Sequence, residues 1–327
     1  MKPRKRALAP YGALALALLC IALATQLFAQ AYPARPVKIV APFAPGGLAD
    51  VLSRALGERL QKQLGQPFVI ENRPGAGGNV GADFVARSDP DGYTLLMSSA
   101  GILTINEFLY PQMPFDPASA FAPVSVVADM PMLLVVRSDL PARDLREFMA
   151  LAKGQPLFFG SPGYGTTGHL GMELFMHATG VKLQHVPYKS AAEAVQAALA
   201  GQTHCMFDNP PTVMAQIRAG GLRPLGVAAK ARIPQLEGVP TIAEAGVPGF
   251  EASSWFGLTV PARTPRPVVE RLAAETARSL RDPEMQGRFE KLGARLVGNT
   301  PAEFAALVEA ERKRWGEVIR AAGIKLQ

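Results

Sequence analysis

Short apolar runs alternate with helical patterns along most of this 327-residue chain, and this alternation restricts the possible folds more than any other feature. Each run is rich in Val, Ile, Leu or Phe and ends at Pro, Gly or a polar turn, which is typical of a buried strand. Residues 50–64 and 170–178 repeat apolar residues at helical spacing. The expected strands are residues 37–41, 68–70, 93–97, 132–136, 157–159 and 225–228. Strands that alternate with helices predict an α/β fold with mixed, mostly parallel sheets flanked by helices.

Residues 1–31 have the pattern of a secretory signal peptide. A basic cluster at residues 2–6 precedes an apolar run over residues 14–24, and Ala29–Ala31 forms a small-x-small cleavage site. These three parts in this order predict export to the periplasm. A membrane anchor is the alternative, but the apolar run is shorter than the roughly 20 residues that span a bilayer.

Removal of this segment changes the charge and the cysteine content. It removes four basic and no acidic residues from totals of 34 Lys+Arg and 27 Asp+Glu, which leaves a net charge of about +3. The remaining basic residues are dispersed, so no nucleic-acid partner is expected. Cys20 follows Leu19 rather than a small residue, so lipidation is not expected, and Cys205 alone forms no internal disulfide or zinc site. We therefore expect no metal and a chain held together by core burial, in two lobes.

Three glycine-rich loops could hold a ligand. The first, residues 42–50, and the second, residues 160–169, each lie between an expected strand and an expected helix. Paired glycines let backbone N–H groups approach an anion closely, and the start of the helix adds the positive end of its dipole. Asp50 would then serve as the N-cap of its helix rather than as a ligand contact. The third loop, residues 72–79, is also explained as a simple turn.

The second loop contains two further patterns. Ser161, Thr166 and Thr167 add hydroxyl groups that can donate hydrogen bonds to a carboxylate. Residues 163–168 match the dinucleotide fingerprint G-x-G-x-x-G, but the acidic residue required about 20 positions later is missing. A dinucleotide-binding fold and a cofactor are therefore not expected.

Enzyme functions find little support in the sequence. The nucleophile-elbow pattern G-x-S-x-G is absent, and none of the four histidines has a metal-ligand partner of the right type at helical spacing. A hydrolase that uses Ser161 and His169 is an alternative, but no third residue is indicated to orient the pair. We therefore expect no catalytic residue.

Six longer motifs occur in order along the chain. They are Pro45-Gly-Gly…Asp50, Glu71-Asn-Arg-Pro-Gly-Ala-Gly-Gly-Asn79, Pro90-Asp-Gly-Tyr-Thr-Leu-Leu96, Gly160-Ser…Gly165-Thr…His169-Leu170, His185-Val-Pro-Tyr-Lys189 and Val239-Pro-Thr-Ile-Ala-Glu-Ala-Gly246. Together they resemble the Bug, or tripartite tricarboxylate transporter receptor, family of periplasmic solute-binding proteins. The resemblance runs from about Pro36 to the C-terminus.

The resemblance implies a two-lobed, Venus-flytrap α/β fold of the type II periplasmic-binding-protein class, which closes over a ligand in a cleft. The first lobe would comprise residues 32–136 and 253–327, and the second lobe residues 137–252. The chain would cross between the lobes near residues 132–137 and 253–261.

The resemblance also implies a ligand site. In that family a ligand carboxylate is held between the first and second glycine loops, largely by backbone N–H groups, hydroxyls and bridging waters. Two polar residues that follow expected strands, Ser99 and Asp208, would also face the cleft. The implied ligand-binding residues are Phe43, Pro45, Gly46, Gly47, Leu48, Ala49, Asp50, Ser99, Ser161, Gly163, Tyr164, Gly165, Thr166, Thr167 and Asp208.

Four positions depart from the residues that are usual in the family. Ala49 stands where Thr or Ser is usual, which removes a hydroxyl donor, and Leu48 adds apolar bulk. Ser190 replaces a glycine, and Ala197 replaces an aspartate. Because loss of one hydrogen bond to a buried carboxylate costs about 1–3 kcal/mol, the hypothesis is that this cleft prefers a less polar acid, such as an aromatic or branched monocarboxylate.

The expected function is that of a monomeric receptor for a small carboxylate-bearing ligand. It would deliver the ligand to the membrane permease subunits of a tripartite tricarboxylate-type transporter. A ligand sensor that signals through a membrane kinase would use the same cleft, so this alternative stays open. The exported hydrolase is the alternative from the enzyme class.

Overall fold

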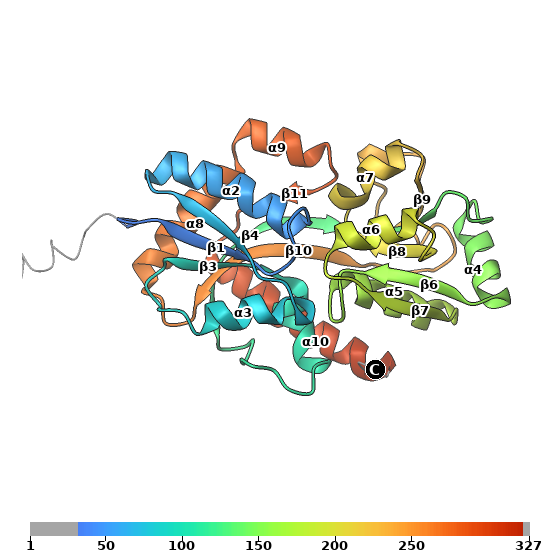
Figure 1. The fold of residues 1–327 in the computed structure, drawn as a ribbon, viewed down its shortest axis with the longest axis horizontal. Coiled ribbons are helices and arrows are strands. Elements are labelled where there is room, and N and C mark those ends of the chain that lie inside the picture. Colours follow the sequence, from blue (N-terminus) through green and yellow to red (C-terminus); the bar gives the residue numbers. More distant parts are fainter. Residues whose placement is uncertain (1–31, 323–327) are drawn as a thin grey trace, which may run out of the picture.

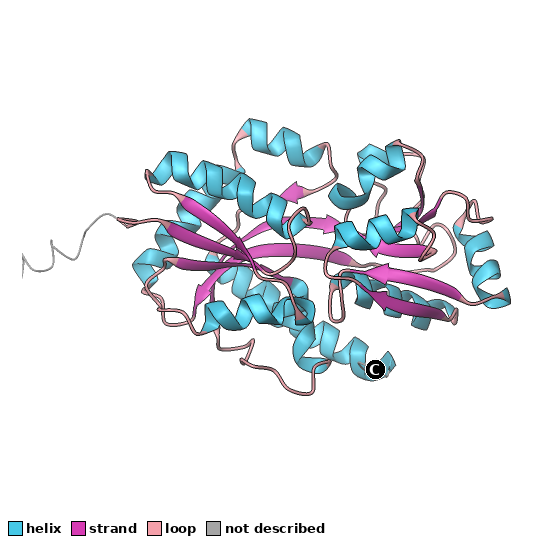
Figure 2. Ribbon diagram, viewed as in Figure 1, coloured by secondary structure: helices cyan, strands magenta, loops and turns pink. Residues whose placement is uncertain are grey.

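The computed structural model describes residues 32–322, and the expected signal peptide lies outside the described residues. Two β-sheets lie side by side, and helices pack on both faces of each sheet (Figure 1, Figure 2). Within residues 32–322, no helix combines the length and the apolar character that crossing a membrane requires.

Sheet A contains the N-terminal strands and the last strands of the described chain. Its strands are β1 (Val37–Ala41), β2 (Phe68–Asn72), β3 (Thr94–Ser99), β4 (Phe121–Pro131), β10 (Ser253–Pro261) and β11 (Arg295–Leu296). The spatial order is β11-β4-β10-β3-β1-β2. β1 pairs in parallel with β2 and β3, whereas β10 pairs antiparallel with both β3 and β4. The sheet is therefore mixed.

Sheet B contains the strands of the middle of the chain. Its strands are β5 (Leu133–Arg137), β6 (Leu157–Ser161), β7 (Leu183–Pro187), β8 (Cys205–Asp208) and β9 (Leu222–Val227), in the order β7-β6-β8-β5-β9. β6 pairs in parallel with β7 and β8, whereas β5 pairs antiparallel with β8 and β9. Each sheet thus has a parallel part and an antiparallel part.

Helices cover both faces of both sheets, so each sheet has a core on either side. The helices are α2 (Leu48–Leu64), α3 (Asn79–Ala86), α4 (Leu145–Gly154), α5 (Thr167–Thr179), α6 (Ala191–Leu199), α7 (Pro210–Arg218), α8 (Arg266–Leu280), α9 (Pro283–Glu290) and α10 (Pro301–Ala322). On sheet A, α2 and α8 cover one face and α3 and α10 the other. On sheet B, α4 and α5 cover one face and α6 and α7 the other. Successive side chains of one strand therefore pack into the cores on opposite faces of the sheet, as those of Ile39 and Val40 do.

Local signals in the sequence explain where several helices begin and end. Thr300 and Glu303 form a capping box at α10: Thr300 Oγ1 accepts a hydrogen bond from the Glu303 N–H, and Glu303 Oε2 accepts one from the Thr300 N–H. Asp144 caps α4, because its Oδ1 accepts a hydrogen bond from the Glu147 N–H at 2.8 Å. Gly65 ends α2 with a φ of 71°, a conformation that favours glycine.

The chain changes sheet between β4 and β5 and returns at the start of β10. β4 and β10 pair with each other from Pro131 and Ser253 at one end to Phe121 and Pro261 at the other. Residues 133–136 pair in sheet B, although the expected boundary of the first lobe was residue 136. The run is apolar on both faces of its strand, so its pattern carries no sign of which sheet it joins.

Candidate functional site

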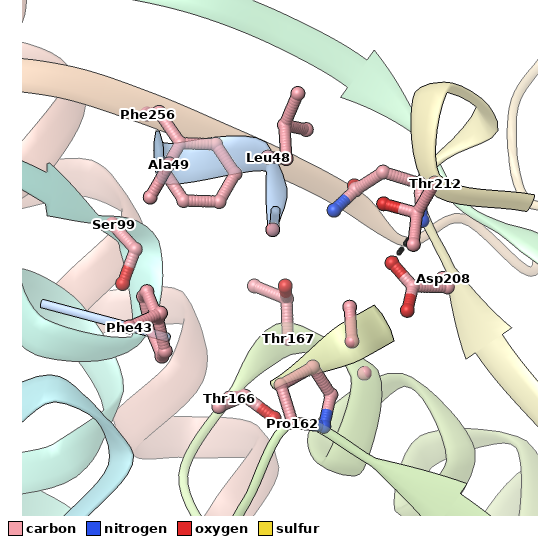
Figure 3. Close-up of a pocket in the computed structure, with 14 residues that line it drawn as sticks. Phe43, Leu48, Ala49, Ser99, Pro162, Thr166, Thr167, Asp208, Thr212 and Phe256 are labelled. Atoms are coloured by element: carbon pink, nitrogen blue, oxygen red, sulfur yellow. Dashed lines mark hydrogen bonds between the residues drawn. The ribbon is translucent and has the colours of Figure 1, made fainter. Parts of the chain in front are cut away.

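A cavity lies between the two sheets, beside the carboxyl ends of β1, β3, β6 and β8 (Figure 3). The loops that follow parallel strands meet at this edge of a sheet, and α/β proteins commonly bind ligands there. The residues that line the cavity are Phe43, Gly47, Leu48, Ala49, Ser99, Pro162, Thr166, Thr167, Gly168, Ala191, Asp208, Asn209, Thr212 and Phe256.

The first glycine loop presents the start of α2 to this cavity. Gly47 is the N-cap residue and has an extended backbone, and no side chain caps the helix. The first N–H groups of a helix have no acceptor within the helix. Those of Leu48 and Ala49 are therefore available to a group in the cavity.

Asp50 stabilises the first loop through hydrogen bonds and does not line the cavity. Its Oδ2 accepts hydrogen bonds from the Gly46 N–H and from Arg54 Nε, both at 3.1 Å, and its Oδ1 accepts one from Asn72 Nδ2 at 3.1 Å. Burial alone would raise the pKa of Asp50, but these hydrogen bonds outweigh burial and hold the pKa below its usual range. The prediction that Asp50 is the N-cap was wrong, because Gly47 occupies that position and Asp50 lies within the first turn.

The second glycine loop presents the start of α5. Thr166 is the N-cap residue: its Oγ1 accepts a hydrogen bond from the His169 N–H at 3.4 Å and donates one to the Gly163 carbonyl at 2.7 Å. Thr167 Oγ1 donates to Ser254 Oγ of β10 at 3.0 Å. This contact joins the start of α5 to a strand of sheet A at the wall of the cavity.

Ser161 is fully buried beneath the second loop and does not line the cavity. Its Oγ lies 2.6 Å from His185 Nε2 and 3.1 Å from the Gly163 carbonyl. The rings of His185 and His169 stack, with their centroids 4.3 Å apart. Burial and the neighbouring His169 lower the pKa of His185 to about 3, so this ring is neutral at pH 7. These contacts support the loop, and in the described chain they place no Ser–His pair at the cavity.

Four helices of the described chain begin at the cavity. The lining includes the first residue of α2, α5 and α6, and the N-cap residue of α7. The N-terminus of a helix carries unpaired N–H groups and the positive end of the helix dipole, and both favour an anion. No Lys or Arg side chain belongs to the lining in the part of the chain that the structure describes. An anionic group would therefore be held by backbone donors.

The remaining walls are largely apolar. Phe43 and Phe256 approach from sheet A together with the side chain of Leu48, and Pro162 lies across from them (Figure 3). Ser99 lies at one side of this view and Asp208 at the other, with Thr167 between them. The cavity therefore combines apolar walls with polar groups at its sides.

The structure brings together part of the predicted ligand site. The predicted residues that line the cavity are Phe43, Gly47, Leu48, Ala49, Ser99, Thr166, Thr167 and Asp208. Those that do not line it are Pro45, Gly46, Asp50, Ser161, Gly163, Tyr164 and Gly165. Among these, Gly163 and Tyr164 line a neighbouring cleft, which they share with the third glycine loop. Contact of each residue with a ligand stays a prediction.

Some lining residues were not predicted from the sequence. They are Pro162, Gly168, Ala191, Asn209, Thr212 and Phe256. Most have a signal that could have found them, because they belong to the second loop or lie at the start of α6 or α7. Phe256 has no such signal, since it lies within β10 and only the pairing of that strand brings it to the cavity.

The described residues contain no group of three or more His, Cys, Asp or Glu side chains that could hold a metal ion. The candidate site is built from backbone donors, hydroxyls and apolar side chains.

The chain resembles known proteins over most of its length. Residues 52–324 match the family model described as tripartite tricarboxylate transporter family receptor. Protein BugT of Bordetella pertussis is 37% identical over 308 residues, which cover 93% of this chain and 94% of BugT. These matches confirm the resemblance that the six motifs indicated.

Solved structures show the same fold. The structure of R. palustris Rpa4515 with adipate has a TM-score of 0.88 at 40% identity and covers 90% of this chain and 100% of that chain. MatC from Rhodopseudomonas palustris with bound malate has a TM-score of 0.85 at 34% identity and covers 88% of this chain and 100% of that chain. The predicted α/β fold of the periplasmic-binding-protein type is confirmed, and the chain belongs to the tripartite tricarboxylate transporter receptor family of solute-binding proteins.

Proposed function

We propose that this protein captures a small carboxylate-bearing solute in the cavity between its two sheets. The observation that carries the proposal is the convergence of four helix N-termini on a cavity with no Lys or Arg in its described lining. Backbone N–H groups at helix N-termini bind anions without a cationic side chain. The complexes of Rpa4515 with adipate and of MatC with malate support a carboxylate as the anion.

The carboxylate is proposed to lie between the first turns of α2 and α5. The N–H groups of Leu48 and Ala49 would donate from one side, and those of Thr167 and Gly168 from the other. These four residues line the same cavity and come from different sheets. A ligand held in this way would join the two halves of the molecule.

The solute is proposed to be less polar than a tricarboxylate. Ala49 contributes no hydroxyl group, and Leu48, Phe43 and Phe256 supply apolar walls. Burial of apolar ligand surface contributes about 25 cal/mol per Å², so these walls favour an aromatic or branched acid.

The remaining parts of the function are proposed from family membership. The receptor would act in the periplasm as a monomer, after removal of residues 1–31, and would pass its solute to the permease subunits of a tripartite tricarboxylate-type transporter. The lobes would be residues 32–131 with 253–327, and residues 133–252, which places the first crossing before β5. Binding and release would need no catalytic step.

A thermal-shift screen tests this proposal. The full chain would be exported by a bacterial host, purified from the periplasm, freed of co-purified ligand and screened against monocarboxylates, dicarboxylates and amino acids. A ligand at 100 times its Kd stabilises the native state by about 2.7 kcal/mol, and each kcal/mol raises the midpoint by roughly 2–4 °C. At least one carboxylate should therefore give a clear shift. No shift from any carboxylate, or a shift from cationic solutes alone, would contradict the proposal.

A further inference from the structure

Asp208 is a buried carboxyl group at the cavity with one oxygen unpaired. It ends β8 and is only 2% exposed. Its Oδ1 accepts a hydrogen bond from the Asn209 N–H at 2.6 Å, but its Oδ2 has no partner among the described residues. Because no Lys or Arg side chain of the described residues belongs to the lining, none of them there offsets the burial of this group by an ion pair. Such a group is rare in a folded protein and requires an explanation.

One neighbour of Asp208 is unpaired in the same way. Asn209 Oδ1 is buried and has no hydrogen-bond partner in the described chain. Asn209 is the N-cap residue of α7 and lines the cavity. Thr212 also lines it and lies beside Asp208 (Figure 3), and its side chain interacts with the carboxyl group of Asp208. Two unpaired polar atoms on one wall of a cavity indicate that their partners come from a bound molecule.

The chemistry of these atoms defines what the bound molecule must supply. A carboxylate oxygen and an amide oxygen only accept hydrogen bonds. We infer that Asp208 Oδ2 accepts a hydrogen bond from an O–H or N–H group of the solute, so that this receptor takes an acid that carries a donor group, such as a hydroxyl, away from its carboxylate. The inference rests on the proposed function and defines the class of solute more closely.

This arrangement discriminates between otherwise similar acids. At pH 8 a second carboxylate on the solute would face Asp208 with like charge, and a methyl group would leave Oδ2 unpaired. Sites built to bind a hydroxyl group reject analogues without it by large factors. We therefore expect an ω-hydroxy acid to bind at least about tenfold more tightly than the matching plain acid and the matching dicarboxylate.

Calorimetric titration at pH 8 tests the inference. The exported full-length protein would be titrated with two matched series, which are butanoate, 4-hydroxybutanoate and succinate, and hexanoate, 6-hydroxyhexanoate and adipate. In Asp208→Asn the amide can donate to a second carboxylate, so the dicarboxylate should gain affinity and the hydroxy acid should lose its advantage. Asp139→Asn makes the same change at an exposed carboxylate of the same half of the molecule. It should change neither the affinity for the dicarboxylate nor the advantage of the hydroxy acid. A thermal unfolding curve for each variant shows that it is folded.

Three outcomes would be decisive. A preference for the hydroxy acid that disappears in Asp208→Asn supports the inference. Equal affinities within each series, or a preference that survives Asp208→Asn, would overturn it and leave the receptor function standing. Absence of binding by all six acids, with no shift in the broader carboxylate screen, would instead overturn the receptor function and the inference together.

Discussion

At the scale of single residues, Asp208 makes the stability of the ligand-free protein depend on pH. Burial raises the pKa of its carboxyl group to about 7, while hydrogen bonds with the Asn209 N–H and the Thr212 side chain act in the opposite direction. The same group ionises near 3.9 in an unfolded chain. Between these two values the folded protein binds more protons than the unfolded chain, so the contribution of Asp208 to stability is lost as the pH rises from about 4 to about 7.

This dependence predicts how Asp208→Asn behaves. The amide does not ionise, so the variant should gain thermal stability relative to the wild-type protein as the pH rises from 4.5 to 7.5. Unfolding midpoints of both ligand-free proteins across this range measure the effect. A difference between the two midpoints that stays constant with pH would show that Asp208 is ionised throughout.

Ala49 has no hydroxyl group at a position in the lining of the cavity. It lies in the first turn of α2, is 1% exposed and lines the cavity, so a hydroxyl at this position would face the ligand. Ala49→Thr should improve the binding of dicarboxylates and weaken the binding of apolar acids, by roughly 1 kcal/mol or about fivefold in Kd. Titration of both classes with both proteins measures this change. Tighter binding of apolar acids with poorer binding of dicarboxylates would contradict the proposed preference for less polar solutes.

At the scale of elements, the close approach of α5 to β8 positions the second loop. A Cβ at Gly168 would lie 2.9 Å from the backbone oxygen of Phe207, so the helix can start this close to the strand only with glycine there. Gly168→Ala should push the start of α5 away, cost about 1–3 kcal/mol of stability and weaken carboxylate binding.

Gly154→Ala is the matched control for this prediction. Gly154 ends α4 in the same half of the molecule, and a Cβ there would meet nothing within 4 Å. This variant should keep its affinity and its stability, or gain slightly in stability. Equal effects of the two substitutions on binding and on the unfolding midpoint would show that the packing of α5 on β8 does not position the site.

At the scale of the whole molecule, the two halves are in contact around the cavity. Leu170 of α5 packs with Ile105, Leu109, Trp315 and Ile319, which belong to the sheet A half. The cavity volume in this arrangement is about 40 Å³. This is room for a few water molecules, each of which needs about 10–15 Å³ by the same measure, and a four-carbon acid is larger. We therefore expect the halves to separate when a solute enters.

One hydrogen bond between the two halves tests whether their contact is part of the ligand-bound state. Tyr110 OH donates to the Tyr164 carbonyl of the second loop at 3.0 Å, and it can do so only while the halves are together. Tyr110→Phe should raise the Kd of any captured carboxylate roughly two- to tenfold, which corresponds to one ordinary hydrogen bond. Tyr32→Phe removes a hydrogen bond to the Gly92 carbonyl within the sheet A half and should leave the Kd unchanged. Equal affinities of Tyr110→Phe and the wild-type protein would argue against this contact as part of the bound state.

Much of the local structure could be predicted from the amino-acid sequence. β1 has the predicted bounds, and the helix expected over residues 50–64 is α2, which begins two residues earlier at Leu48. These features depend on periodicity, turns and caps, which act over a few residues. The glycine loops were also evident, because a strand, paired glycines and a helix follow one another directly. Motif resemblance then indicated the family.

Which of these residues lie next to one another could not be predicted, because it depends on the packing of distant parts of the chain. β4 carries Pro and Asp residues among its apolar ones and was not predicted as a strand, yet it forms the long pair with β10 that brings Phe256 to the cavity. Ser161, which was expected to contact the ligand, lies within hydrogen-bond distance of His185 on another strand and does not line the cavity. The unpaired Oδ2 of Asp208 is likewise visible only once the neighbouring elements are in place. The pairing of distant strands and the burial of a single polar atom depend on contacts between residues that are far apart in the sequence. A local sequence pattern therefore does not predict them.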